Sequence, residues 1–310
     1  MERVIKIGTR GSKLALWQAD YVADLLQQKG LQSEIVIIET KGDKILDRSL
    51  SKIGSKGVFT EELEDQLRTG GIDIAVHSAK DMQATLPEGF KIIAFTEREL
   101  VNDVIVSLKD GIDLNNGKEV VLGTSSVRRV AMLKHYYPHV KVVDMRGNLQ
   151  TRMRKLEEGQ CDALVLAYAG VHRMHYEEHI TQHLPLDQFT PAAGQGSVAI
   201  EVSENLDEAV IKEIRNAVND KDTEYRLLAE RSFLHTLQGG CSIPAFALAN
   251  LEGSENISIT GGLVRLDGSE VIKKTLNGSK EDAERLGDEV AQWILDNGGK
   301  ELLAEIKQQK

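Results

Sequence analysis

The stretch Ile5-Lys6-Ile7-Gly8-Thr9-Arg10-Gly11-Ser12 resembles a second stretch further along the chain, Val120-Val121-Leu122-Gly123-Thr124-Ser125-Ser126. Both consist of aliphatic and β-branched residues, then Gly-Thr, then a serine in a position to cap a helix. Each stretch therefore predicts a strand, a tight turn and a helix. We interpret the pair as a weak internal repeat, which predicts two similar lobes.

Short β-branched runs alternate with helical patterns around both stretches. This alternation is typical of α/β folds, in which helices cover both faces of a mostly parallel sheet. The first series predicts strands at 5–9, 34–40 and 72–77 and helices at 13–28 and 60–67. The second series predicts strands at 104–108, 120–123, 140–144 and 163–167 and helices at 126–136 and 149–158.

The pattern changes twice in the second half of the chain. A proline and two glycines at 190–196 predict a hinge before a strand at 198–202, and we hypothesise that the chain returns there to the first lobe. After about residue 220, one helix at 224–237, strands at 245–251, 257–265 and 271–276 and a closing helix from 280 to about 295 predict a small α+β domain. The expected domains are 1–98 with 197–217, 99–196, and 218–310.

Composition excludes several classes of protein. The chain has 310 residues, of which 41% are hydrophobic and 28% charged, so we expect a folded protein with more than one core. Its net charge of -10 disfavours binding to nucleic acids or anionic membranes. No apolar run has the length of a membrane span or an export signal, so we expect a cytoplasmic protein. Nothing in the sequence predicts a large apolar interface, so we expect a monomer.

Basic residues gather where three of the predicted helices begin. The partial positive charge of a helix N-terminus makes each such cation unfavourable by about 0.3–1 kcal/mol unless an anion is bound. Each group follows a strand whose carboxyl end borders the ligand crevice of an open α/β sheet. We therefore predict a ligand with several carboxylates or phosphates, against the alternative of solvated surface cations. The residues are Arg10 and Lys13, then Arg128 and Arg129, then Arg146, Arg152 and Arg154.

Two further features suggest chemistry. The buried-looking strand that begins at Asp73 ends in the ionisable pair Lys80-Asp81, at the mouth of the same crevice, although Asp81 is equally suited to cap a turn. Cys241 follows Gly239-Gly240 in a loop, where a thiolate near cations would be nucleophilic. Cys161, the other cysteine, is interpreted as a small buried hydrophobe.

The histidine-rich stretch His175-Tyr176-Glu177-Glu178-His179 matches the H-x-x-E-H pattern of inverted zinc proteases. No distal acidic ligand can be assigned to it. We interpret the spacing as that of an exposed helical face and expect no metal site.

Several of these segments together resemble the porphobilinogen deaminase (hydroxymethylbilane synthase) family, collinearly from the first strand to the final helices. The motifs that carry the resemblance are Gly8-Thr9-Arg10 with Ser12, Leu14-Ala15-Leu16-Trp17-Gln18, Lys56-Gly57-Val58-Phe59, Asp73 to Asp81, Gly123 to Arg129, Arg146-Gly147-Asn148 with Thr151-Arg152, Gly194-Gln195-Gly196 and Gly239-Gly240-Cys241.

The resemblance implies a three-domain transferase of haem and other tetrapyrrole biosynthesis. Its first two domains would resemble periplasmic binding proteins, with the active site between them. Four porphobilinogen molecules would be deaminated and joined head to tail into hydroxymethylbilane on a dipyrromethane cofactor, which a thioether holds at Cys241. Asp81 would be the catalytic carboxylate, which stabilises positive charge on the reacting pyrrole.

The resemblance also assigns residues to the acetate and propionate groups of cofactor and substrate, and two lysines to a flexible loop over the cleft. The carboxylate-binding residues would be Arg10, Arg128, Arg129, Arg146, Arg152 and Arg173, supported by Ser12, Lys80, Thr124 and Ser126. The loop lysines would be Lys52 and Lys56.

The chain departs from the family pattern at two places and leaves two other readings open. Gln83 stands where the family often has proline, and Leu100-Val101-Asn102 lacks the family's usual Pro and Arg, which bears on the stiffness of that connection. A noncatalytic two-lobed protein that binds anionic ligands is the main alternative. A nucleotide-dependent enzyme ranks last, because neither glycine-rich phosphate motif occurs at a strand-helix junction.

Overall fold

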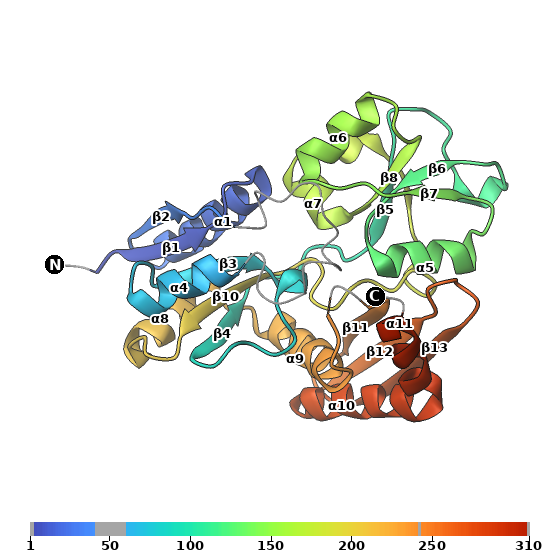
Figure 1. Cartoon of the computed structure of the whole chain (residues 1–310). Helices are drawn as coiled ribbons and strands as arrows, with labels where there is room; N and C mark the ends of the chain where they lie inside the picture. The colour runs from blue at the N-terminus through green and yellow to red at the C-terminus, as the bar shows by residue number, and fades with distance from the viewer. Residues whose placement is uncertain (1–2, 41–59, 241–242, 309–310) are drawn as a thin grey trace. The chain divides into compact units, whose positions relative to one another are not determined.

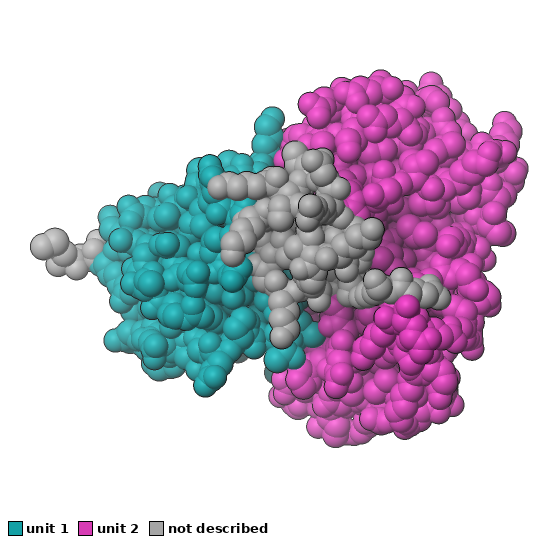
Figure 2. Space-filling view, viewed as in Figure 1, with its two compact units in different colours: residues 1–99, 196–225 teal, residues 100–195, 226–310 magenta. Residues whose placement is uncertain are grey.

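The computed structural model describes residues 3–40, 60–240 and 243–308. These residues form two compact units, one of residues 1–99 with 196–225 and one of residues 100–195 with 226–310 (Figure 2). The second unit contains two separate sheets. The finer division into three domains with the boundaries given above stays a prediction.

Unit 1 is built on a five-stranded sheet with the order β2-β1-β3-β10-β4 (Figure 1). β1 pairs in parallel with β2 and β3, whereas β10 runs antiparallel between β3 and β4. The strand after the predicted hinge thus returns to the first sheet, in agreement with the hypothesis drawn from the sequence. The strands are β1 (Ile5–Thr9), β2 (Ser33–Ile37), β3 (Ile74–Ser78), β4 (Phe90–Phe95) and β10 (Val198–Ser203).

Helices cover both faces of this sheet. α1 (Lys13–Gln28) and α8 (Glu208–Val218) pack their apolar sides against one face. α4 (Glu61–Thr69) contributes Leu63 and Leu67 to a smaller cluster on the other face. A short 3₁₀ turn, η1 (Ala79–Asp81), follows β3.

The first sheet of unit 2 has the order β7-β6-β8-β5-β9, with β6 parallel to β7 and β8 and β5 antiparallel to β8 and β9. The topology of unit 1 is therefore repeated, and the α/β class with two mostly parallel lobes is confirmed. α5 (Val127–Tyr136) packs on one face, and α6 (Leu149–Glu157) and α7 (Tyr168–Arg173) pack on the other. The strands are β5 (Asp103–Val106), β6 (Val121–Gly123), β7 (Lys141–Val143), β8 (Ala163–Ala167) and β9 (Ile180–His183).

The remainder of unit 2 is the predicted α+β part. Its antiparallel sheet has the order β11-β12-β13, formed by β11 (Ala245–Glu252), β12 (Asn256–Val264) and β13 (Val271–Ser279). The helices are α9 (Lys221–Thr236), α10 (Ala283–Ile294) and α11 (Lys300–Gln308), and the boundary between the units falls within α9. No helix in the described ranges is long and apolar enough to cross a bilayer.

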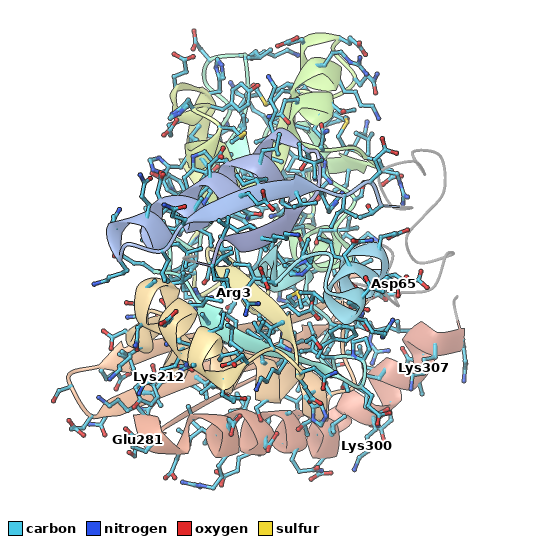
Figure 3. All side chains as sticks on the ribbon, turned by 90° about the vertical axis from the view of Figure 1, so that its left-hand side faces the viewer. Arg3, Asp65, Lys212, Glu281, Lys300 and Lys307 are labelled. Carbon is cyan, nitrogen blue, oxygen red and sulfur yellow. The ribbon has the colours of Figure 1, made fainter. Side chains whose placement is uncertain are left out.

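The expected closing helix is not the last one. Gly298 adopts a φ of 102°, which ends α10's regular course, but α11 follows directly. Leu302 and Ile306, four residues apart, are buried on one side of α11, while Lys300 and Lys307 are exposed (Figure 3). Burial of this apolar pair explains why the helical structure resumes after the glycines.

Candidate active site

The first group of predicted residues follows β1 in unit 1. Ser12 is the N-cap of α1, and its Oγ accepts a hydrogen bond from the backbone N–H of Ala15 at 3.3 Å. The first turn of α1 holds no acidic residue, so the partial positive charge of this helix end is uncompensated there. Arg10 is half-buried just before the cap, whereas Lys13 is exposed.

The second group follows β3, the parallel neighbour of β1. Lys80 is half-buried and Asp81 exposed, both in η1. The backbone N–H of Ala79 donates to the carbonyl of Ser197 at 3.0 Å, which fixes the start of this turn against β10. Since β1 and β3 run in the same direction, their carboxyl ends bring both groups to one edge of the sheet of unit 1.

The corresponding edge in unit 2 follows β6. Ser126 is the N-cap of α5 and accepts from the backbone N–H of Arg129 at 3.4 Å. Thr124 is buried, and its Oγ1 accepts from the backbone N–H of Ser126 at 3.3 Å. α5 also lacks an acidic residue in its first turn.

Arg128 and Arg129 are buried rather than solvated, at 4% and 6% exposure, and both bind Asp103, the first residue of β5. Nη2 of Arg128 lies 2.6 Å from one oxygen of Asp103, and Nη2 of Arg129 lies 2.7 Å from the other. Gln195 donates to the same carboxylate at 3.0 Å. Arg128 also donates to the carbonyl of Thr190 and Arg129 to that of Val165, at 2.9 Å each, and Nη1 of Arg128 lies 3.5 Å from Sδ of Met132.

The charge of this buried group is not balanced. Burial alone would raise the pKa of Asp103, but the charges of Arg128 and Arg129 outweigh burial and hold it well below its usual range. One ionised carboxylate against two guanidinium groups leaves one positive charge in excess at the N-terminus of a helix. Such a charge favours a bound anion.

The other predicted arginines of unit 2 differ in their surroundings. Nε of Arg146 donates to Asp144 at 2.7 Å, and Nε of Arg152 donates to the carbonyl of Gly147 at 2.9 Å. Arg173, the last residue of α7, is buried at 7% exposure. Because β6, β7 and β8 are parallel neighbours, the residues that follow them share one edge of the sheet.

Two cations of the predicted groups fit the solvated alternative. The side chain of Arg154 is 68% exposed and pairs with Glu158 one helical turn on at 3.7 Å, and Lys13 is exposed as well. Cys161 is buried as predicted, and burial raises the pKa of its thiol. Lys52, Lys56 and Cys241 lie outside the described residues.

The histidine-rich stretch is not a helical face as expected. α7 ends at Arg173, and His175 adopts a φ of 58°. The backbone N–H groups of His175 and Tyr176 donate to the carbonyls of His172 and Val171, which is the Schellman pattern of a helix end. In the described part of the chain no three ligand-type side chains are arranged to hold a metal ion.

Sequence reasoning missed Asp103 and the role of Gln195. Asp103 precedes the fully buried residues Val104, Ile105 and Val106. A carboxylate at the start of an apolar strand was a usable signal, because such a charge is buried only with a partner. Gln195 was noted as part of a hinge, not as a donor.

Comparison with known proteins places these features in a family. A family model described as porphobilinogen deaminase, dipyrromethane cofactor binding domain, matches residues 5–212, and one described as the C-terminal domain of porphobilinogen deaminase matches residues 225–296. The chain belongs to the porphobilinogen deaminase family. Its similar relatives include the porphobilinogen deaminase of Cytophaga hutchinsonii, 58% identical over 99% of this chain and 98% of that protein. That of Desulfosudis oleivorans is 50% identical over 99% of both chains.

Solved structures with some likeness include the VFT2 domain of Bordetella pertussis BvgS. It is 20% identical, with a TM-score of 0.45 over 74% of this chain and 92% of that one. A likeness this weak adds nothing to the topology described above. The porphobilinogen deaminase family itself implies a dipyrromethane cofactor, and the basic, partly buried edge of unit 2 fits a group that carries carboxylates.

Proposed function

We propose that the chain is a porphobilinogen deaminase, which joins four porphobilinogen molecules head to tail into hydroxymethylbilane. The observation that carries this proposal is the excess positive charge of Arg128 and Arg129 over Asp103 at the N-terminus of α5. In a chain of net charge -10, buried cations in this position favour a ligand with several carboxylates. Porphobilinogen carries two, and their number grows as the product lengthens.

The residues of unit 2 would hold the dipyrromethane cofactor. Its carboxylates would be bound by five of the arginines of that unit, supported by Thr124 and Ser126, and the thiol of Cys241 would attach it. When bound, the cofactor supplies the pyrrole onto which the first substrate condenses. These arginines are Arg128, Arg129, Arg146, Arg152 and Arg173.

In each condensation the aminomethyl C–N bond of porphobilinogen breaks and the nitrogen leaves as ammonia. A C–C bond forms to the free α-carbon of the preceding pyrrole, and that carbon gives up its hydrogen as a proton. Asp81 stabilises the positive charge that develops on the pyrrole nitrogen and mediates the proton transfers. Arg10, Ser12 and Lys80 bind the carboxylates of the incoming substrate, and water releases the finished chain.

The substitution Asp81→Asn tests this assignment. Turnover of porphobilinogen should fall by about a thousandfold or more, because a neutral amide neither stabilises the cation nor takes the proton. Asp65→Asn, an exposed carboxylate on α4, is the matched control and should leave ammonia release unchanged. Near-normal turnover of Asp81→Asn in a folded protein would exclude Asp81 as the catalytic group.

Intact mass tests the attachment of the cofactor. The native protein should carry an excess mass equal to one dipyrromethane, and Cys241→Ser should lack it. Cys161→Ser should keep the excess mass, because Cys161 is buried in the core of unit 2. An excess that persists in Cys241→Ser would show that another residue holds the cofactor.

We further propose a monomeric cytoplasmic enzyme that binds neither nucleic acid nor membrane. The net charge of -10 supports the absence of nucleic-acid binding. We also propose the three domains predicted from the sequence. One family model ends at residue 212 and the other begins at residue 225, which supports a domain boundary between these two residues. Light scattering of the purified protein tests the monomer directly.

A further inference from the structure

Three ionisable side chains are buried together on the face of the unit 1 sheet that α4 covers. Glu64 comes from α4, His77 from β3 and Glu201 from β10, with exposures of 5%, 7% and 0%. None of them belongs to the candidate active site. Ionisable groups are seldom buried to this extent without a partner or a role.

The contacts within this cluster are electrostatic. Nε2 of His77 lies 2.9 Å from Oε2 of Glu201. Neither atom makes a hydrogen bond of normal geometry, and Oε1 of Glu64 makes none either. Burial first, and then the charge of Glu201, raise the pKa of Glu64, although a hydrogen bond from Thr60 opposes them.

Two carboxylates therefore share one imidazole in the interior. Because burial and the charge of Glu201 raise the pKa of Glu64, the neutral acid form of this carboxyl is more favoured than in an exposed glutamate, which limits the negative charge buried beside Glu201. Other charged side chains on α4 and on the neighbouring strands lie further toward solvent, and Arg68 and Lys91 pair with Asp65 and Glu208. Of these side chains, Lys6, Glu61, Asp65 and Arg68 are exposed, whereas Glu62 and Lys91 are half-buried.

The cluster is connected to η1 at both ends. His77 precedes Asp81 by four residues on the strand that leads directly into the turn. On the other side, Nε2 of Gln83 donates to Oγ1 of Thr60 at 3.4 Å, and the Thr60 hydroxyl is hydrogen-bonded to Glu64. Thr60 occupies the N-cap position of α4 but its hydroxyl does not cap the helix, so it is engaged by Gln83 and Glu64 instead.

We propose that Glu64, His77 and Glu201 form a positioning cluster that holds the turn bearing Lys80 and Asp81 in its reactive geometry, with Thr60 and Gln83 as the connection. The proposal rests on the proposed function, because it concerns the placement of Asp81. The cluster touches no substrate, and it acts by fixing the backbone on either side of the catalytic carboxylate. Displacements of about 1 Å at such a group reduce rates by about a hundredfold.

His77→Gln and Thr60→Val test the connection by steady-state kinetics. Each should lower kcat for porphobilinogen by about tenfold or more with KM changed by less than about twofold, because a geometry needed only in the transition state is lost. Ile214→Ala, in the apolar core on the opposite face, is the control. It should lower the melting temperature but leave kcat unchanged below the transition.

Glu64→Gln tests the protonation state. Because the pKa of Glu64 is raised in the folded protein, its contribution to stability is present below the ordinary value of 4.5 and is lost as pH rises through the folded pKa. Glutamine resembles the neutral acid and does not ionise. The stability of the variant should therefore fall less than that of the native protein as pH rises.

The outcomes separate the two hypotheses. If His77→Gln and Thr60→Val lose stability but keep kcat, as Ile214→Ala should, the cluster is merely structural and the proposal is overturned. If His77→Gln does not fold, Thr60→Val alone decides, because Val has nearly the shape of Thr and replaces its hydroxyl with a methyl group. If the native protein does not consume porphobilinogen, the proposed function fails instead, while the pH dependence of unfolding of Glu64→Gln still tests the charge state of the cluster.

Discussion

The sheet of unit 1 and the first sheet of unit 2 have the same topology, and each buries a carboxylate on its fourth strand. β10 is the fourth strand of the first sheet and β5 the fourth of the second, and both run antiparallel to their neighbours. Glu201 on β10 and Asp103 on β5 are both 0% exposed. The two carboxylates differ in their charged neighbours. Glu201 lies beside one histidine and a second carboxylate, whereas Asp103 binds two arginines.

The difference follows from the position of each residue along its strand. Asp103 lies opposite Ala167, the last residue of β8, at the edge where the first turn of α5 brings its arginines. Glu201 lies opposite Ala75, the second residue of β3, away from that edge and under α4. The two sheets thus share one topology, but their buried carboxylates lie at different distances from the carboxyl edge, and this distance decides which side chains each carboxylate meets.

The helices fall into two groups according to whether their first turn contains an acidic residue. α1, α5, α6 and α7, which follow β1, β6, β7 and β8, have no acidic residue in the first turn. α4, α8, α9, α10 and α11 all have at least one. Acidic residues stabilise a helix N-terminus, so their absence at these ends leaves the partial positive charge available to anions in each unit.

The largest expected effect is that of Asp103→Asn. Removing the carboxylate leaves two buried guanidinium groups without their counter-charge, and the free energy of unfolding should fall by about 3–5 kcal/mol. Because the pKa of Asp103 is depressed, its contribution is present above the ordinary carboxyl pKa and lost as pH falls, so the difference from the native protein should narrow in acid. Chemical denaturation over a range of pH measures both effects.

Asp65→Asn serves as the control for this prediction. Asp65 pairs with Arg68 at 2.7 Å, but both side chains are more than half exposed, so its loss should have little effect. If Asp65→Asn and Asp103→Asn lowered the free energy of unfolding by similar amounts, burial would not explain how much Asp103 contributes to stability.

A smaller loss is expected from Glu201→Gln. Histidine can become neutral when its counter-charge is removed, whereas arginine cannot. The free energy of unfolding should therefore fall by about 1–3 kcal/mol, less than for Asp103→Asn. Both variants can be unfolded in the same denaturant series. If Glu201→Gln is more destabilising than Asp103→Asn, the expected order of the two buried carboxylates is wrong.

Much of the fold was predictable because periodicity and caps are local. The helix at 13–28 matches α1, and the strands at 5–9 and 163–167 match β1 and β8. Five of the α-helices and strands in the described residues were not predicted: β4, β9, α7, α8 and α11. β9 and α7 are short, and their residues are mixed in polarity, so tertiary pairing rather than local pattern defines them.

The candidate site was predictable only in part. Cations at helix starts are visible in the sequence, and Arg128, Arg129 and Arg146 do lie at such starts. The sequence gives no indication that Asp103 binds two of them, because that contact joins residues 25 and 26 positions apart. The burial of His77 with Glu201 across more than a hundred residues is equally invisible to a local pattern.

The smallest expected effect concerns the two helix caps, which the repeat makes equivalent. Ser12 and Ser126 have similar backbone angles, φ -72° and ψ 147° against φ -77° and ψ 117°, and similar cap distances of 3.3 and 3.4 Å. Ser12→Ala and Ser126→Ala should each lower the free energy of unfolding by about 0.5–2 kcal/mol, and glycine at either position by only a few tenths. Thermal unfolding of the four variants measures this. A much larger loss of unfolding free energy for Ser126→Ala than for Ser12→Ala would mean that Ser126 also interacts with the buried charges beside α5. The two repeats would then be equivalent in their strands but not in their helix caps.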